Sequence, residues 1–207
     1  MASTYLYHET GSTTTSVKLA TLSAWVKRSG IGSNTCIFGH EESNSLRSAI
    51  YINDDDNFLY FQNGSNIFLT NRKFRDPSAW YHFVIQWDLT QSTAANRVKL
   101  WVNGVQETSF SSTSYPAQNA SDSVPNFGQQ TVGANRYNSN VSILYDGYMN
   151  HVAFVDGTAL TPSNFGETDA ASGIWKWKSP SGVTWGNNGF HLKFDNDANL
   201  GLDSSGE

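Results

Sequence analysis

The chain of 207 residues contains a single cysteine, Cys36, so no internal disulfide can form and the fold must hold by packing alone. It has no run of about 20 apolar residues that could span a membrane. Residues 1–15 lack the basic and apolar regions of a secretory signal peptide. The formal net charge is −5 and no basic run occurs, which argues against nucleic acid and membrane insertion among its partners.

What the chain does have is rings and small polar residues. Hydrophobic residues make up 38% of it, aromatics 14% and charged residues only 15%, so the core is sizeable and built largely from aromatic side chains. The length fits one large β-sandwich. We therefore predict a single domain over 1–207, with its core in 17–165, an aromatic segment and last strand in 174–195, and a polar tail in 196–207.

Two Asn-Gly dipeptides fix the structural class. Asn63-Gly64 lies between FLYFQ and SNIFL, and Asn103-Gly104 lies between VKLWV and VQ. Asn-Gly accepts the positive φ angles of a type I′ turn, and the flanking residues favour strands, so each unit predicts a β-hairpin. No amphipathic helix of useful length is present. The prediction is an antiparallel all-β protein.

Alternation predicts which strand faces enter the core. In 17–27, Leu22, Ala24 and Val26 share one face; in 80–89, Tyr81, Phe83, Ile85, Trp87 and Leu89 share one. The opposite face of 80–89 is partly apolar, which predicts a central strand covered on both sides. Further strands are expected at 35–39, 49–52, 131–134, 141–145, 147–155 and 190–194. Residues 40–48 and 108–128 are expected to be loops, 53–57 a solvated acidic turn, and 161–166 one helical turn.

Four motifs in order carry a family resemblance: LSAWVK at 22–27, WYHF at 80–83, KLWVNG at 99–104 and DGYMNHV at 146–152. This succession resembles the laminin-G-like, concanavalin A-like lectin/glucanase superfamily over roughly 17–165. The stretches FGETD at 165–169, GFHLKF at 189–194 and DSSG at 203–206 resemble a narrower group in tail-fibre and other structural proteins of marine bacteriophages. The resemblance implies a jelly-roll sandwich of two curved antiparallel sheets. It also implies glycan binding and, as in many members, a structural calcium.

Candidate ligand-binding residues combine a ring with amide or guanidinium groups that can bond to sugar hydroxyls. They are Asn135, Arg136, Tyr137 and Asn138, which lie between two predicted strands, and Tyr115 in the long loop. An ordinary loop is the alternative interpretation. Trp175, Trp177 and Trp185 form the other ring cluster, and we expect these to clamp the C-terminal segment onto the sandwich.

Calcium prefers six to eight oxygen ligands, often from loops. The candidates are Asp54 and Asp56 in the acidic turn and Asp146 at the start of a strand. Their alternative roles are a charged turn and strand-start turn chemistry. The five histidines show no pairing typical of a transition-metal site, and Cys36 is expected to be a buried small hydrophobe.

Catalysis finds little support. Retaining glycosidases need two carboxylates about 5–5.5 Å apart. Glu167 and Asp169 begin the Glu-x-Asp-x-x-Glu pattern of family 16 glucanases, but Ser172 replaces the last Glu. No predicted strand carries carboxylates two residues apart, and no Gly-x-Ser-x-Gly occurs. We predict a protein that is not an enzyme.

The sequence thus predicts a non-catalytic, lectin-like module of a phage virion protein that contacts a host cell-surface polysaccharide. It would lie on the virion surface or be extracellular. One alternative is a structural virion module that contacts other virion proteins. Another is a degenerate polysaccharide hydrolase. Fold resemblance alone does not separate them.

Overall fold

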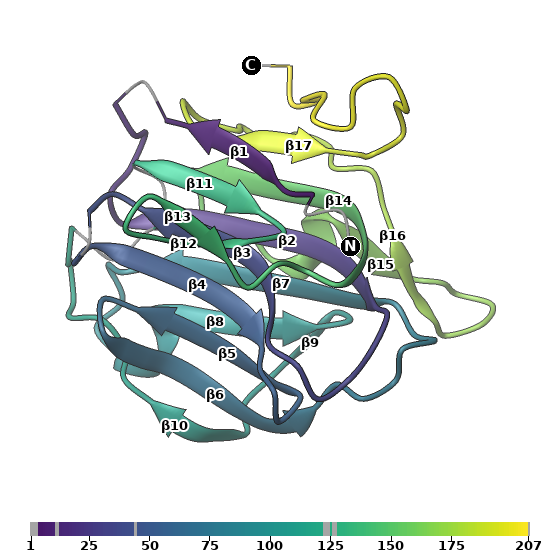
Figure 1. The fold of residues 1–207 in the computed structure, drawn as a ribbon, viewed down its shortest axis with the longest axis horizontal. Helices are drawn as coiled ribbons and strands as arrows, with labels where there is room; N and C mark the ends of the chain where they lie inside the picture. The colour runs from purple at the N-terminus through teal and green to yellow at the C-terminus, as the bar shows by residue number, and fades with distance from the viewer. Residues whose placement is uncertain (1–3, 11–12, 44, 122–124, 126–127, 207) are drawn as a thin grey trace.

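The computed structural model describes residues 4–10, 13–43, 45–121, 125 and 128–206, and these form two large antiparallel sheets (Figure 1). The seven-stranded sheet has the order β1-β11-β3-β4-β5-β6-β10, and the six-stranded sheet has the order β17-β14-β2-β7-β8-β9. The predicted all-β antiparallel sandwich is confirmed. The described residues contain no helix long and apolar enough to cross a membrane.

The seven-stranded sheet is assembled from strands far apart in the chain. Its members are β1 (Leu6–Glu9), β3 (Thr35–Glu41), β4 (Arg47–Ile52), β5 (Asn57–Gln62), β6 (Ser65–Lys73), β10 (Phe110–Thr113) and β11 (Gln129–Val132). The six-stranded sheet contains β2 (Leu19–Arg28), β7 (Tyr81–Asp88), β8 (Val98–Val102), β9 (Val105–Gln106), β14 (Gly147–Asp156) and β17 (Phe190–Leu192). Both Asn-Gly turns adopt positive φ at Asn and Gly, as predicted.

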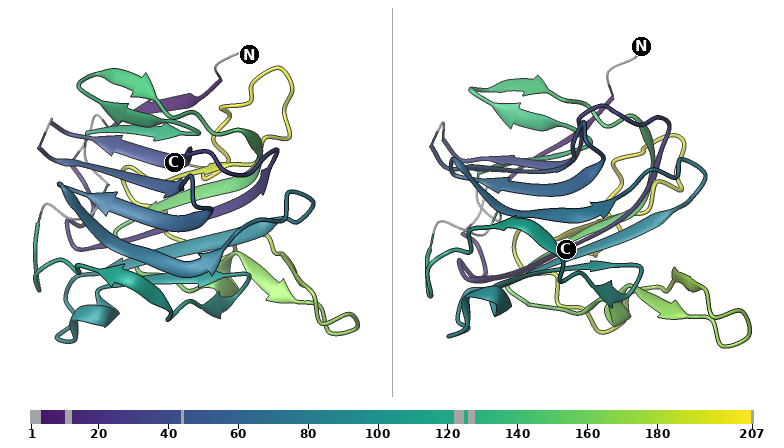
Figure 2. Two further views of the ribbon diagram at one scale, coloured as in Figure 1. Left: turned by 60° about the horizontal axis from the view of Figure 1, so that its bottom comes forward. Right: turned by 90° about the horizontal axis from the view of Figure 1, so that it is seen from below.

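Two small hairpins lie outside the large sheets (Figure 2). The hairpin of β12 (Asn135–Tyr137) and β13 (Asn140–Ser142) lies over the outer face of the seven-stranded sheet and contacts β3 and β4. The hairpin of β15 (Gly166–Thr168) and β16 (Trp175–Trp177) lies on the opposite side, over the six-stranded sheet. Two single-turn helices, η1 (Ala94–Asn96) and η2 (Pro162–Asn164), complete the elements, and η2 confirms the helical turn expected at 161–166.

The core between the sheets contains Phe83, Ile85 and Trp87, which alternation predicted, together with Leu100 and Phe154. Each of these side chains is at most 3% exposed. Trp87 also donates a hydrogen bond from Nε1 to the Tyr60 hydroxyl (3.1 Å), so its one polar atom is satisfied inside the core. Cys36 is fully buried, and burial raises the pKa of its thiol, which confirms the interpretation of a small hydrophobe.

The second face of β7 is covered by the C-terminal segment. Val84 on that face packs with Trp101, Phe165 and Trp185 in a cluster separate from the main core. Trp175 fits against Gly104 and Gly166, where an added Cβ would approach the indole ring to 2.5 Å. The prediction of a strand covered on both sides is confirmed, and the tryptophans do clamp the C-terminal segment.

Several boundaries were predicted wrongly. Strand β1 was missed, and β10 lies inside the expected loop 108–128. Strand β3 extends to Glu41 and β4 begins at Arg47, both inside the expected loop 40–48. Residues 135–138, expected between strands, include β12. These short strands are polar or lie at sheet edges, so they lack the alternation that a buried face imposes.

Candidate functional site

Glu41 organises the turn of the β12–β13 hairpin, which contains the predicted ligand residues. Its carboxylate is buried and accepts backbone N–H bonds from Asn138 (2.5 Å) and Ser139 (3.1 Å), whose φ angles are +56° and +61°. The guanidinium of Arg136 forms an ion pair with the same carboxylate, with Nε 3.3 Å from Glu41 Oε2. A residue 97 positions away in the chain therefore fixes a strained turn in one orientation.

Tyr137 is the exposed ring of this hairpin. Its side chain is 42% exposed, and the guanidinium of Arg47 lies 3.9 Å from its ring centroid. Arg47 also lies 5.2 Å from the ring of Phe61, so the cation has an aromatic neighbour on a second strand. Such cation–π contacts contribute about 0.5–1 kcal/mol at exposed sites. The ring of Tyr137 is held in place before any ligand arrives.

The other residues predicted on the hairpin have different roles. Asn135 is buried and donates from Nδ2 to Ser142 Oγ (3.3 Å), which joins the two strands. Arg136 is neutralised by Glu41 and lies 5.2 Å from the ring of Tyr7. Asn138 is exposed at the turn. Of the four predicted hairpin residues, Tyr137 and Asn138 are thus the exposed ones.

Tyr115 lies apart from the hairpin but at the same end of the seven-stranded sheet. It lines a shallow pocket of ≈ 170 Å³ together with Gln62, Asn63, Ser65, Ile67, Ser114 and Pro116. Gln62 is 5% exposed, and its Oε1 has no hydrogen-bond partner among the described residues. Asn63 links the Tyr115 pocket to Arg47 beside Tyr137. Its side-chain oxygen accepts from the Arg47 N–H, and its backbone N–H donates to the Arg47 carbonyl (both 2.9 Å).

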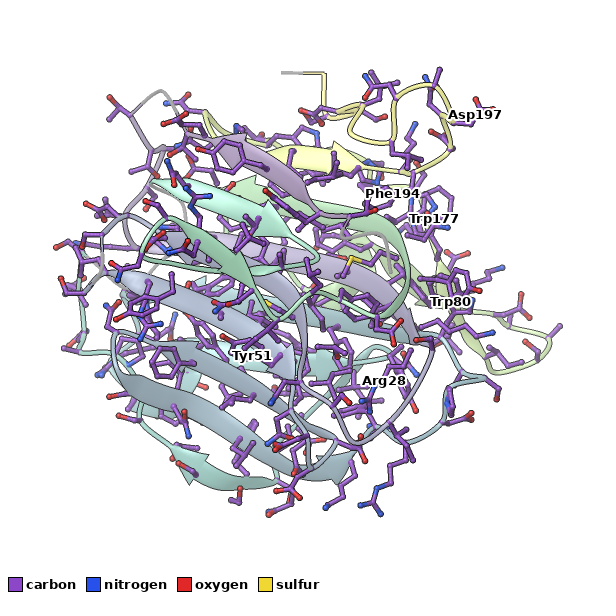
Figure 3. All side chains as sticks on the ribbon, in the orientation of Figure 1. Arg28, Tyr51, Trp80, Trp177, Phe194 and Asp197 are labelled. Atoms are coloured by element: carbon purple, nitrogen blue, oxygen red, sulfur yellow. The ribbon has the colours of Figure 1, made fainter. Side chains whose placement is uncertain are left out.

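These neighbours were not found from the sequence. Arg47 and Glu41 fell in the expected loop 40–48, and Phe61 was counted only as a strand residue. Arg47 and Tyr51 are in fact the two residues of β4 that are only partly buried, and Tyr51 is seen on the sheet in Figure 3. The pairing of Arg47 with Glu41 across β3 and β4 is what brings the set beside Tyr137.

The predicted calcium ligands do not come together. Asp56 is buried, at 4% exposure, instead of lying in a solvated turn. It pairs with Arg28 Nη1 (2.7 Å) and Arg75 Nε (3.2 Å) and accepts the Gly32 amide (2.9 Å). Burial by itself would raise the pKa of Asp56, but these three donors outweigh it and hold the pKa below the usual value. Two cations already compensate this carboxylate, so it does not fit a calcium ion.

Asp54 and Asp146 are exposed, and each lies on its own segment. Among the residues that the structure describes, no group of three or more His, Cys, Asp or Glu side chains could hold a metal ion. No step of the function is therefore derived through a metal, and calcium binding stays a prediction.

The carboxylates of the incomplete glucanase pattern share one lysine. Lys176 Nζ lies 2.9 Å from Asp169 Oδ2 and 3.5 Å from Glu167 Oε1 on the β15–β16 hairpin. Asp169 also accepts hydrogen bonds from the backbone N–H and hydroxyl of Ser172. Lys176 and these Ser172 donors together hold the pKa of Asp169 well below its usual value. A carboxyl group kept ionised is a poor general acid.

His82 and Ser23 form a buried contact that resembles a Ser–His pair. Ser23 Oγ lies 2.8 Å from His82 Nε2, and Trp175 Nε1 donates to His82 Nδ1 (2.9 Å). Because indole can only donate, Nδ1 carries no proton and Nε2–H donates to Ser23. The histidine therefore cannot accept the serine proton in this state. Its role is to hold Trp175.

The family model described as the concanavalin A-like lectin/glucanases superfamily matches residues 2–164, which is most of the chain. The chain belongs to this superfamily. The matched residues include the two hairpins with Asn-Gly turns and the β12–β13 hairpin. A search of curated protein sequences found no significant match.

Solved structures share the superfamily fold at low sequence identity. A heptameric SAP-like pentraxin from Limulus polyphemus has 17% identity and a TM-score of 0.55, over 87% of this chain and 81% of that one. A putative carbohydrate-binding protein from Bacteroides ovatus has 17% identity and a TM-score of 0.57, over 93% and 50%. Domain 4 of an arabinanase from Geobacillus stearothermophilus, in complex with arabinotriose, has 18% identity and a TM-score of 0.52, over 75% and 66%. The likeness is one of fold.

Proposed function

We propose that this chain is a non-catalytic carbohydrate-binding module and that Tyr137 is the centre of its glycan site. The observation that carries the proposal is the exposed Tyr137 ring held on the Arg47 guanidinium at 3.9 Å. One face of a tyrosine ring is the platform on which the apolar face of a sugar stacks. A platform fixed in advance loses little conformational entropy on binding.

Polar groups that can hydrogen-bond to sugar hydroxyls lie at the same end of the seven-stranded sheet as Tyr137. Asn138 is exposed at the hairpin turn, and Gln62, Ser65 and Ser114 line the Tyr115 pocket. Amides and hydroxyls both donate and accept, which matches the alternating needs of sugar hydroxyls. A chain of several sugar units would extend from Tyr137 toward Tyr115, past the Arg47–Asn63 hydrogen bonds.

Two proteins of similar fold support this assignment. The arabinanase domain was solved with arabinotriose, and the Bacteroides ovatus protein is described as a putative carbohydrate-binding protein. The carboxylates Glu167 and Asp169 are committed to Lys176, which supports binding without cleavage.

The module's setting rests on the phage-like motifs in 165–206. We propose that it belongs to a phage virion protein and contacts host surface polysaccharide. A glycan array that contains both bacterial surface polysaccharides and eukaryotic glycans tests this setting. Selective binding to the bacterial set is expected, and selective binding to the eukaryotic set would contradict it.

The test of the site is Tyr137→Ala. Loss of a central stacking ring should weaken glycan binding at least about 10-fold, as for an interface hot spot. The matched control is Trp80→Ala, which removes an aromatic ring of similar exposure, 40%, away from the hairpin. Both variants should unfold at nearly the wild-type temperature. Equal glycan affinity in wild type and Tyr137→Ala would remove the hairpin from the site.

A further inference from the structure

Arg47 brings to the Tyr137 site a positive charge that no carboxylate of the described residues pairs with. Its guanidinium lies over two rings, 3.9 Å from the centroid of Tyr137 and 5.2 Å from that of Phe61. A guanidinium has five N–H donors. Among the residues that the structure describes, the side-chain donors of Arg47 have no hydrogen-bond partner and form no ion pair. These nitrogens are not buried, so a ligand can reach them from solvent.

The carboxylate that lies opposite Arg47 in the sheet is already compensated. Glu41 is the register partner of Arg47 across β3 and β4. Its carboxylate forms an ion pair with Arg136 and accepts the backbone N–H groups of Asn138 and Ser139. One arginine therefore balances the charge of Glu41, and the charge of Arg47 remains.

The strands around Arg47 add positive charge and no negative charge. The adjacent strands β4, β5, β6 and β10 contain Arg47, Arg72 and Lys73 but no Asp or Glu, although the formal net charge of the chain is −5. Glu42, in the turn between β3 and β4, lines a polar hollow with Glu9 of β1, on the far side of β3 from Arg47. The surface that contains Arg47 therefore attracts anions.

Tyr51 supplies a second donor on the same face of β4. Its two neighbours in the strand belong to the core, so Tyr51 lies on the outward face of the sheet (Figure 3). Burial raises the pKa of its hydroxyl, and the nearby charge of Arg47 opposes this rise only in part. The hydroxyl therefore stays protonated and can donate. The ring of Phe61, which pairs with Ala49 between the two donors, makes the surface between them apolar.

We propose that the glycan bound at the Tyr137 site is anionic and that Arg47 pairs with its oxyanion. This inference rests on the proposed function, which takes the ligand to be a glycan that stacks on Tyr137. The sugar unit next to the stacked one carries a carboxylate, sulfate or phosphate group. Two oxygens of that group accept N–H bonds from the planar guanidinium, and the Tyr51 hydroxyl donates to the same sugar unit.

The two rings prepare Arg47 for such a contact. They hold the guanidinium in place but give its N–H groups no oxygen or nitrogen acceptor, so the hydrogen-bonding capacity of these groups is kept. A neutral glycan would offer hydroxyls to these donors and leave the charge of Arg47 balanced only by solvent ions. An oxyanion forms paired, charge-assisted bonds with the same fork, and these are stronger. The geometry therefore favours an acidic glycan over a neutral one.

The first test reads the glycan array by the charge of each polysaccharide. We expect every strong binder to carry carboxylate, sulfate or phosphate groups. A strong binder without any of these groups would overturn the inference and leave the proposed function standing. An array without any binder would overturn the proposed function, and the inference with it.

The second test removes the charge from the tightest binder and measures both forms by isothermal titration calorimetry. A carboxylate is reduced to the alcohol, a sulfate ester is removed by solvolysis, and a phosphate monoester is removed with a phosphatase. The treatment that lowers the affinity identifies the source of the oxyanion. The loss should be about 10- to 100-fold, which corresponds to hydrogen bonding to a charged group. Equal affinity for the two forms would overturn the inference.

Variants of Arg47 separate pairing with the ligand from support of Tyr137. Arg47→Gln should weaken binding of the acidic form about 10- to 100-fold, but binding of the neutralised form by less than about 5-fold, the value of the lost ring contact. Arg47→Lys keeps the charge without the planar fork and should recover part of the affinity. The matched control is Lys99→Gln, which removes the same charge from β8 in the other sheet and should change neither affinity. An equal loss for both forms in Arg47→Gln, or no loss for the acidic form, would overturn the inference.

One competitor distinguishes an acidic-glycan site from a general anion site. Poly-L-glutamate carries carboxylates but has no sugar ring to stack on Tyr137, so at the same carboxylate concentration it should not displace the glycan. Displacement would mark a general anion site and overturn the inference. Tyr137→Ala would still test the proposed function, because the stacking ring and the paired cation are different groups.

Discussion

His82 makes the stability of this protein fall as the solution becomes mildly acidic. It is fully buried between the rings of Trp25 (4.6 Å between centroids) and Trp175 (6.0 Å). Both ring nitrogens are committed, Nδ1 as acceptor from Trp175 and Nε2–H as donor to Ser23. Burial lowers the pKa of His82 to about 3, while an unfolded histidine titrates near 6.5.

The direction and size of this change in unfolding free energy follow from proton linkage. Above about pH 6.5 the histidine is neutral in both states, and the pKa shift costs nothing. Between about pH 6.5 and 3 only the unfolded chain binds the proton, so the folded state loses about 1.4 kcal/mol per pH unit. Lowering the pH from 7 to 5 should therefore remove about 2 kcal/mol of unfolding free energy through His82 alone.

The assay is urea unfolding followed by tryptophan fluorescence at pH 7 and at pH 5. His82→Phe keeps a ring in the stack but removes the titrating group. Its loss of stability between the two pH values should be about 2 kcal/mol smaller than that of wild type. Burial also lowers the pKa of His191 to about 4 and that of His151, and these contributions cancel in the comparison. The control is His8→Asn, at an exposed histidine.

An equal pH dependence in wild type and His82→Phe would refute the reasoning. It would mean that His82 accepts a proton in the folded state as readily as in the unfolded chain. The Trp175–His82 hydrogen bond would then not be the contact that holds the β15–β16 hairpin.

Three further predictions concern the core and the acidic turn. Trp87→Ala should cost about 3–5 kcal/mol in unfolding free energy, because the ring is fully buried; a loss below about 1 kcal/mol in urea unfolding would place the ring outside the core. Asp56→Asn should cost about 3–5 kcal/mol by leaving the buried Arg28 uncompensated, while Asp54→Asn should change stability by less than about 0.5 kcal/mol; similar losses for both would contradict the ion pair. Calcium should not bind at Asp56, since two arginines neutralise its carboxylate; a calcium-dependent rise in the thermal unfolding midpoint that Asp56→Asn abolishes would contradict this.

The β-hairpins and the core could be predicted because local chemistry decides them. Asn63-Gly64 turns where it does because those two residues accept positive φ, whatever the rest of the chain does. Phe83, Ile85 and Trp87 face the core because a strand alternates its side chains and burial sorts the apolar set. Tyr137 was expected in a loop between two strands; it is exposed, but it lies in β12.

The candidate site could be predicted only in part, because its support comes from distant segments. Tyr137 was a candidate from its neighbours in the chain, but Arg47 beneath it and Glu41 behind the turn belong to strands about 90 residues earlier. The sequence around Arg47 and Glu41 gives no sign of either contact. The same holds for Asp56, which appeared as one of three solvated acids and is instead buried by Arg28 and Arg75.

The all-β class, the two tight turns and the residues of the core could be established from the chain alone, because turn chemistry and two-residue alternation act within a few positions. Which charges meet, and where β1, β10 and β12 pair, depended on the tertiary structure. Those outcomes depend on strand register and sheet order, which join residues such as Glu41 and Asn138 across the chain.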